Sequence, residues 1–323
     1  MNLHLSLFKI KNKTQSTFFR WTYDWKRSAP PCQRIVILFF NGMWEQPLTY
    51  PPEELPEDCE ITMDKRRMRE ATAVVFHIPS LGSLRRVRKF PGQIWVAWSM
   101  ECEAHYPQLL DHTFMSQFDW TMTYHRDADV RVPYYSPNFE RLLLSQPRTH
   151  AGLVAFFASG CHDQSRRIAY AAELMRHIEV HSYGSQLRNR RLIRDNGRPT
   201  KLQTIAAYKF TLAFENAIAP DYVTEKFFDP LIVGSVPVYL GAPNVGDFAP
   251  GEHCYIEAVK FDNPRMLAEY LLHLDANDAL YQQYLAWKQC GLRPSFIRLL
   301  NEQRTHPFVR LYHKLRALRT CSV

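Results

Sequence analysis

The sequence lacks the patterns by which cysteine and histidine commonly bind metal ions. Its seven cysteines are scattered from Cys32 to Cys321, an odd number with no CxxC pair, and no HExxH motif occurs among its thirteen histidines. This distribution predicts no structural zinc site. It also favours a reducing compartment, in which most of the cysteines serve as small core residues.

Long apolar runs are also missing from the chain. No segment approaches the roughly 20 consecutive apolar residues that cross a bilayer as a helix. The first residues, MNLHLSLFKIKNK, place lysines after a short apolar segment and lack a small-residue cleavage site, so we expect no signal peptide. The sequence leaves open whether a membrane anchor lies upstream of this chain.

The charge balance is basic, and a nucleic-acid-binding motif is absent. Forty lysines and arginines against 32 acidic residues give a formal net charge of +8. Such a balance favours an anionic partner, which could be a nucleic acid, a membrane surface or a phosphorylated substrate. Because no recognised nucleic-acid motif accompanies the charge, we expect no nucleic acid as a partner.

Short apolar strands that alternate with other segments predict an α/β protein. Buried strands are predicted at 34–40, 71–78, 93–98 and 118–124. After a connection at 136–150 the pattern restarts, with a strand at 153–158, a helix at 163–177, a strand at 179–181 and helices at 264–274 and 279–288. Two successive α/β units predict two domains, 1–150 and 151–300, that face each other across a cleft.

The stretch 208–241 contains the densest set of candidate site residues. Two apolar strands, 208–213 and 236–240, enclose a polar loop that opens into a helix at Thr224. The loop and the first helical turn carry Glu215, Asn216, Asp221, Tyr222, Glu225 and Lys226. Each residue could simply cap a helix or face solvent, but open α/β sheets bind ligands at such an edge.

The C-terminal segment, 301–323, reads as a basic amphipathic helix. Phe308, Leu311, Tyr312 and Leu315 fall on one face, and arginine, lysine and histidine occupy much of the rest. The apolar stripe could pack on the protein, or the helix could make a peripheral contact with an anionic membrane.

From Phe90 to Lys288 the chain resembles the α1,3/α1,4-fucosyltransferase family, glycosyltransferase family 10. The resemblance rests on YKFTLAFENAIAPDYVTEKFFDPLIVGSVPVYLG, with its FEN and Tyr-x-Thr-Glu-Lys cores and closing VPVYLG. The segments FDWTMTYHRDADVRVPY and GLVAFFASGCHDQSRRIAYAAEL are also similar to the family, as is APNVGDFAPGEHCYI. The resemblance implies the GT-B fold, two Rossmann-like domains, with GDP-fucose held by the second.

The resemblance also implies roles for single residues. Lys226 and Arg167 would hold the donor diphosphate, while Glu225 and Tyr222 would contact the ribose and guanosine side. Glu215 and Asn216 would lie near the sugar or the nucleotide. A carboxylate such as Glu215 could stabilise an oxocarbenium-like transition state, or it could cap a backbone turn.

A general base is implied in the first domain. Glu101 stands in WVAWSMECEAHYP where the family has its catalytic glutamate, although Cys102 and Glu103 follow it where the family often has a small residue and proline. We expect Glu101 to be the base, with Glu103 as the alternative. Asp127 and Asp129 have the spacing of a metal motif, but the resemblance places them in the acceptor half, and no metal cofactor is expected.

The implied activity is transfer of L-fucose from GDP-fucose, with inversion, to a glycan acceptor. The acceptor would be an N-acetylglucosamine or glucose hydroxyl, in α1,3 or α1,4 linkage, and a protein O-fucosyltransferase is the alternative. The arginine-rich segment 184–201 could line the donor pocket or be a solvated loop. The expected location is cytoplasmic or peripheral to the membrane in a bacterium, or the Golgi membrane in a eukaryote with an upstream anchor.

Overall fold

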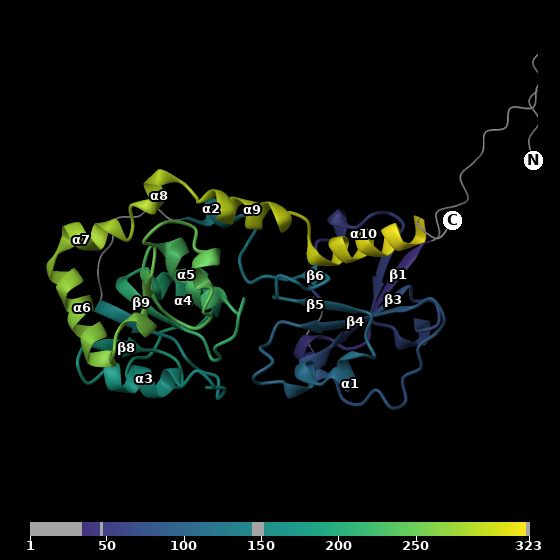
Figure 1. Cartoon of the computed structure of the whole chain (residues 1–323), viewed down its shortest axis with the longest axis horizontal. Helices are drawn as coiled ribbons and strands as arrows, with labels where there is room; N and C mark the ends of the chain where they lie inside the picture. The colour runs from purple at the N-terminus through teal and green to yellow at the C-terminus, as the bar shows by residue number, and fades with distance from the viewer. Residues whose placement is uncertain (1–33, 46–47, 144–151, 321–323) are drawn as a thin grey trace, which may run out of the picture. The chain divides into compact units, whose positions relative to one another are not determined.

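Two parallel β-sheets make up the framework of the molecule. The computed structural model describes residues 34–45, 48–143 and 152–320, which belong to one compact unit that begins at Arg34. Within it, one sheet is built from residues 35–131 and the other from residues 152–257 (Figure 1). The predicted α/β class is therefore confirmed.

The first sheet has the strand order β2-β1-β3-β4-β5-β6, and all of its pairings are parallel. Its strands are β1 (Ile35–Phe39), β2 (Cys59–Thr62), β3 (Ala73–His77), β4 (Ile94–Ser99), β5 (Trp120–Thr123) and β6 (Val130–Arg131). The four predicted strands are β1, β3, β4 and β5. The sequence reading missed β2, which follows a proline-rich acidic stretch, and β6, which is two residues long.

Both faces of the first sheet are covered. Ile35, Ile37 and Phe39 point to the face on which the C-terminal helix α10 (Pro307–Thr320) packs. Leu38, Val74 and Phe76 point to the opposite face, which loops and the short helix α1 (His112–Met115) cover. Because all of the strands are parallel, their carboxyl ends lie at one edge of the sheet, where polar residues can gather.

The second sheet has the order β11-β10-β9-β7-β8 and is also parallel throughout. Its strands are β7 (Gly152–Phe156), β8 (Val180–Ser182), β9 (Tyr208–Phe214), β10 (Val236–Leu240) and β11 (Ile256–Glu257). The central pair β9 and β10 is fully hydrogen-bonded from Phe210–Val236 to Phe214–Leu240. These are the two strands that enclose the predicted site loop.

Helices cover the two faces of the second sheet. Side chains of α3 (Arg167–Leu174), α6 (Pro264–Ala276) and α7 (Asp278–Gln283) pack with Phe210, Leu212 and Phe214. The opposite face packs against α4 (Arg198–Ile205) and α5 (Glu225–Val233), and against α2 (Phe139–Leu142), α8 (Trp287–Cys290) and α9 (Pro294–Glu302). Coverage on both faces explains why these strands are almost wholly apolar.

Two helix predictions differ from the structure, and a third helix, α4, was not predicted. The helix predicted at 163–177 is confined to α3, because Arg166 adopts a left-handed conformation (φ 56°) directly before it. The segment 279–288 is divided between α7 and α8. Helix α4 lies in the arginine-rich stretch, where few apolar residues signal it; Ile205 is its one buried residue.

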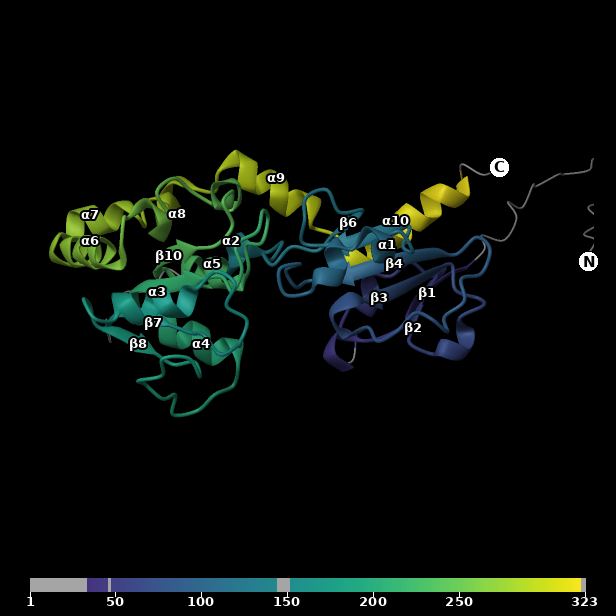
Figure 2. The same cartoon turned by 60° about the horizontal axis from the view of Figure 1, so that its bottom comes forward.

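The apolar stripe of α10 is buried within the protein. Leu311 and Leu315 are almost wholly inaccessible, and they pack with Ile35 and Phe39 of the first sheet. Figures 1 and 2 both show α10 lying along this sheet. The prediction of a peripheral membrane contact therefore finds no support in the structure, because the face that would enter the membrane is already packed. None of the helices in the described ranges is long and apolar enough to span a membrane.

The cysteines divide between core and surface. Cys59, Cys102 and Cys254 are buried and free, as expected of small core residues, whereas Cys161 and Cys290 are exposed and free. The predicted domain limits at 150 and 300 stay predictions, and residues 144–151 lie outside the described residues.

Candidate active site

The carboxyl ends of the strands supply most of the predicted site residues. Glu215 and Asn216 directly follow β9, and Glu101 comes two residues after β4. Lys226 and Glu225 begin α5, the helix that connects β9 to β10. Parallel strands align their carboxyl ends, so residues distant in sequence meet at one edge.

The start of α5 is held by a buried carboxylate. The side chain of Thr224 caps the helix by accepting a hydrogen bond from the Lys226 amide. Glu215, wholly buried, accepts hydrogen bonds of 2.8 Å from both the amide and the hydroxyl of Thr224. Gly241 makes room for it, since a Cβ there would lie 2.6 Å from the Glu215 Cγ. Glu215 thus fixes the position of the first helical turn.

Lys226 lies among acidic groups at this helix end. Its Nζ is 3.4 Å from Glu215 Oε2 and 3.3 Å from Glu225 Oε1. Burial alone would lower the Lys226 pKa, but the two carboxylates raise it, so the ammonium is charged. Burial would raise the pKa of Glu225, but Lys226 and Lys201 lower it to about 2. The lysine side chain is 21% exposed, so it can contact a ligand.

Arg167 and Asn216 bring further polar atoms to the same place. Arg167 is almost wholly buried, and its Nη1 donates to the Phe214 carbonyl, while its Nε has no hydrogen-bond partner among the described residues. The Asn216 Oδ1 is likewise buried and without a partner in the described part of the chain. Burial lowers the Arg167 pKa, although Glu215 opposes the shift. Buried polar atoms without partners are costly, and a bound ligand would satisfy them.

Two histidines that the sequence reading did not single out lie beside this group. The rings of His105 and His162 stack with centroids 4.3 Å apart, and Tyr106 lies 6.0 Å from His162. Burial and the neighbouring His162 lower the pKa of His105, so its ring is neutral near pH 7. The segments that carry them, AHYP and GCHD, resemble the family, but nothing in their spacing signals a chemical role.

Three tyrosines connect the loop after β9 to residues of the first sheet. The buried ring of Tyr222 lies 5.0 Å from that of Tyr124 and 6.1 Å from that of Tyr134. The Tyr134 hydroxyl donates a hydrogen bond to the carbonyl oxygen of Met100, the residue before Glu101. Asp221, in a left-handed conformation (φ 63°), accepts a hydrogen bond from the Arg126 amide. These contacts place the Tyr-x-Thr-Glu-Lys loop beside Glu101.

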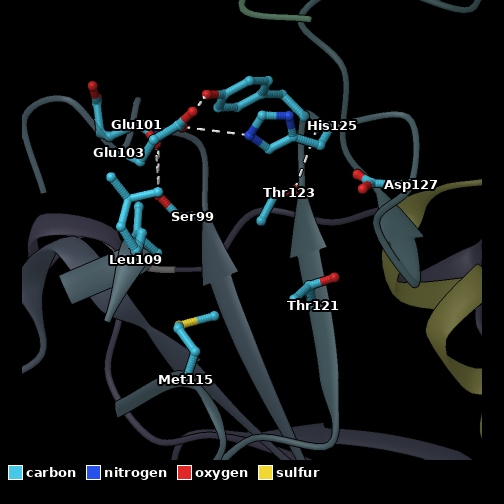
Figure 3. A pocket seen from close by; sticks show the side chains of 11 residues that line it. Ser99, Glu101, Glu103, Leu109, Met115, Thr121, Thr123, His125 and Asp127 are labelled. Atoms are coloured by element: carbon cyan, nitrogen blue, oxygen red, sulfur yellow. Dashed lines mark hydrogen bonds and ion pairs between the residues drawn. The ribbon is translucent and has the colours of Figure 1, made fainter. Parts of the chain in front are cut away.

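Glu101 and Glu103 have different surroundings. Glu103 accepts a 2.6 Å hydrogen bond from the Tyr124 hydroxyl and lies 3.4 Å from His125 Nε2 (Figure 3). Burial would raise its pKa, but His125 and Tyr124 lower it to about 2. For Glu101, burial raises the pKa, and Lys226 and His162 oppose the shift. A carboxylate with a raised pKa is the stronger base of the two.

A pocket of about 350 Å³ opens next to both glutamates. Figure 3 shows Thr121 and Thr123 on β5, and Leu109 and Met115 at the left of the view. The lining is more apolar than polar, with the carboxylates of Glu101 and Glu103 at the end of the sheet. Such a pocket can hold a substrate group beside Glu101.

The spaced aspartates have separate surroundings. Asp129 accepts a hydrogen bond from the Thr121 amide and pairs with Lys314 at 2.8 Å, whereas Asp127 lines the pocket beside Glu101. Within the described ranges, histidine, cysteine, aspartate and glutamate form no group of three or more that could hold a metal ion.

Solved structures of other proteins share this fold. A crystal structure of an α1,3-fucosyltransferase aligns over 91% of this chain and 93% of its own, with a TM-score of 0.60 and 17% identity. A second, described as α1,3-fucosyltransferase with GDP-fucose, covers 82% of this chain and 84% of its own, with a TM-score of 0.54 and 16% identity. The fold is therefore that of the GT-B fucosyltransferases.

Family models assign the chain more closely. Residues 32–135 match the model "Fucosyltransferase, N-terminal", and residues 147–320 match "Glycosyltransferase family 10 (fucosyltransferase) C-term". The chain belongs to glycosyltransferase family 10, the fucosyltransferases, as the sequence motifs indicated.

Relatives within the family carry two kinds of name. α-(1,3)-Fucosyltransferase B of Drosophila melanogaster is 33% identical over 79% of this chain and 62% of its own. GDP-fucose protein O-fucosyltransferase 3 of Homo sapiens is 36% identical over 61% of this chain and 45% of its own. The chicken (Gallus gallus) protein of the same name is 32% identical over 93% and 66%. The chain thus spans roughly half to two thirds of these relatives' lengths.

Proposed function

We propose that this protein transfers L-fucose from GDP-fucose to an acceptor hydroxyl, with inversion at the anomeric carbon. One observation carries the proposal: the contact of Tyr222 with Tyr134, whose hydroxyl donates to the Met100 carbonyl, places the loop that leads to Lys226 beside Glu101. Lys226 is charged, and the raised pKa of Glu101 suits a base. Inverting transfer needs these two groups, a cation for the leaving diphosphate and a base for the attacking hydroxyl.

The leaving group is GDP. As the bond between the anomeric carbon and the phosphate oxygen breaks, GDP takes the electron pair, and its negative charge must be stabilised. Lys226, Arg167 and the amino end of α5 supply positive charge and N–H donors for it. We propose that these groups suffice without a metal cofactor. Asn216, whose Oδ1 has no hydrogen-bond partner among the residues that the structure describes, would bind a hydroxyl group of the donor.

The attacking hydroxyl loses its proton to Glu101. The hydroxyl oxygen bonds to the anomeric carbon on the face opposite the phosphate, and the carboxylate accepts the proton. We assign this role to Glu101 because both hydrogen-bonding neighbours of Glu103 stabilise that carboxylate in its charged form, which makes it a weak base.

Glu215 is proposed to position Lys226. Both of its oxygens are occupied by Thr224, and the nearer one to Lys226 is 3.4 Å away. The alternative, direct stabilisation of the oxocarbenium-like transition state, requires an oxygen that faces the sugar. Tyr222 and Glu225 would contact the nucleoside side of the donor, Glu225 through its partly exposed carboxylate.

Two acceptor classes are proposed, in order. The first is an N-acetylglucosamine hydroxyl of a glycan, the acceptor that the family resemblance implies, and the name of the Drosophila relative favours an α1,3 linkage. The second is a hydroxyl of a protein, which the name of the human and chicken relatives favours. Mass-spectrometric analysis of products separates them, with GDP-fucose offered together with N-acetyllactosamine and with folded protein domains. If neither the glycan nor the protein domains gain fucose, the proposed transfer is contradicted.

A further inference from the structure

A second pocket, of about 300 Å³, shares no lining residue with the pocket beside Glu101. Its wall includes Phe157, which follows β7, and Tyr183 and Gly184, which follow β8. Glu225, whose neighbour Lys226 would hold the diphosphate, forms part of the same wall. If the proposed function holds, a nucleotide with its diphosphate at Lys226 extends its nucleoside into this pocket.

The pocket has a flat aromatic wall. The rings of Phe157 and Tyr183 stack with centroids 5.0 Å apart and an angle of 17° between their planes. Gly184 permits the close approach of the two loops, since a Cβ there would lie 2.0 Å from the Ala158 carbonyl oxygen. Aromatic faces of this kind bind nucleobases by stacking, whichever base is present.

The cations of the pocket are already paired. Asp229, wholly buried in α5, pairs with Arg198 at 2.7 Å and with Lys201 at 3.1 Å. Both cations come from α4, so the three side chains hold this helix and the loop before it against α5. The arginine-rich segment therefore has a structural part that places the loop at the pocket.

Asp195 is the carboxylate that this loop presents to the pocket. Its Oδ1 accepts a 2.8 Å hydrogen bond from the Gly197 amide. In the described part of the chain no other hydrogen bond or ion pair to Asp195 occurs, so Oδ2 and the second lone pair of Oδ1 can both accept from a ligand. Asp195 and the aromatic pair lie in the same pocket wall.

We propose that Asp195 selects guanine as the base of the donor nucleotide. Guanine presents two adjacent donors, the N1–H and the 2-amino group, which a carboxylate can accept together. Hypoxanthine lacks the 2-amino group and offers one donor. Adenine has an acceptor at N1, which a carboxylate repels. The carboxylate thus ranks GDP above IDP, and IDP above ADP.

The test is calorimetric binding of GDP, IDP and ADP to the full chain and to Asp195→Ala. Loss of a hydrogen bond to a charged group predicts about 10- to 100-fold weaker GDP binding in the variant, and convergence of its GDP and IDP affinities. Asn196→Ala is the matched control, because Asn196 is exposed in the same loop and does not line the pocket. It keeps the wild-type order of affinities.

The outcomes separate this inference from the proposed function. An unchanged ratio of GDP to IDP affinity in Asp195→Ala overturns the inference while leaving GDP as the donor nucleotide. Equal binding of GDP and IDP by the wild-type chain overturns it in the same way. If the wild-type chain binds no GDP, the proposed function fails, and the inference fails with it. Residual IDP binding by Asp195→Ala confirms that the variant is folded.

Discussion

Replacement of Lys226 by methionine removes one positive charge while keeping the length of the side chain. The ammonium lies 3.4 Å from Glu215 and 3.3 Å from Glu225, and 21% of the side chain is exposed. A hydrogen bond to a charged group contributes about 1.5–3 kcal/mol, so GDP should bind roughly 10- to 150-fold more weakly to Lys226→Met.

The same replacement has a cost for stability. It leaves the wholly buried carboxylate of Glu215 without its cation, which destabilises a protein by about 3 kcal/mol when the group stays ionised. Burial already raises the Glu215 pKa above 4.5, and the loss of Lys226 raises it further. A carboxyl pKa raised in the folded state means that stability falls as the pH rises above the unfolded value. The destabilisation should therefore grow as the pH rises through the raised pKa of Glu215.

Isothermal titration calorimetry with GDP measures the first effect, and thermal unfolding at several pH values measures the second. Lys209→Met is the matched control, because Lys209 is a partly buried lysine on β9 that pairs with Asp275 at 2.7 Å, apart from the donor cluster. GDP binding by Lys226→Met within about twofold of the wild-type affinity, with the fold intact, would refute the assignment of Lys226 to the diphosphate.

Three further changes test other parts of the molecule. Glu103→Gln should lose about 2 kcal/mol of stability at pH 7, because the Glu103 pKa is lowered to about 2 in the folded protein. The difference in the free energy of unfolding, measured with urea, should shrink as the pH falls from 4.5 towards 2. Equal stability of the variant and the wild type at pH 7 would count against this prediction. Asp229→Asn should lower stability by about 2–3 kcal/mol because it leaves Arg198 and Lys201 without their buried partner, and a melting temperature equal to that of wild type would contradict this. Leu311→Ala should lower the free energy of unfolding by about 3 kcal/mol, since the side chain is wholly buried against the first sheet. Leu318→Ala, at an exposed position of the same helix, should change it little. Equal effects of the two substitutions would contradict the packing of α10.

The framework was predictable because its strands are buried on both faces. Short apolar runs such as IVILF, AVVFH and VPVYL are typical of buried strands, and eight predicted strands are present in the structure. Strand β2 was missed because CEIT is mixed in character and only its Cys59 is buried. Helix α4 was missed because its position is set by the buried Asp229, an interaction between residues 28 and 31 positions apart that no local pattern records.

The candidate site was predictable where it is continuous in sequence. Glu215, Tyr222, Glu225 and Lys226 lie within twelve residues, and the cap at Thr224 brings them together. Tertiary packing decides the rest. The choice between Glu101 and Glu103 depends on Tyr124 and His125, which follow β5, and the stacking of His105 on His162 joins segments 57 residues apart in the chain (162 − 105). The sequence pattern therefore does not predict that the pKa of Glu101 is raised while that of Glu103 is lowered.

The most direct test of the account is the rate of fucose transfer by Glu101→Gln. With GDP-fucose labelled in the sugar, the label that enters an N-acetyllactosamine or protein-domain acceptor is followed for wild type, Glu101→Gln and Glu103→Gln. The account predicts a loss of about 10²- to 10⁴-fold for Glu101→Gln with GDP binding unchanged, a far smaller loss for Glu103→Gln, and a wild-type rate that falls as the pH drops through the raised pKa of Glu101. Transfer by Glu101→Gln at the wild-type rate would contradict the assignment of Glu101 as the base.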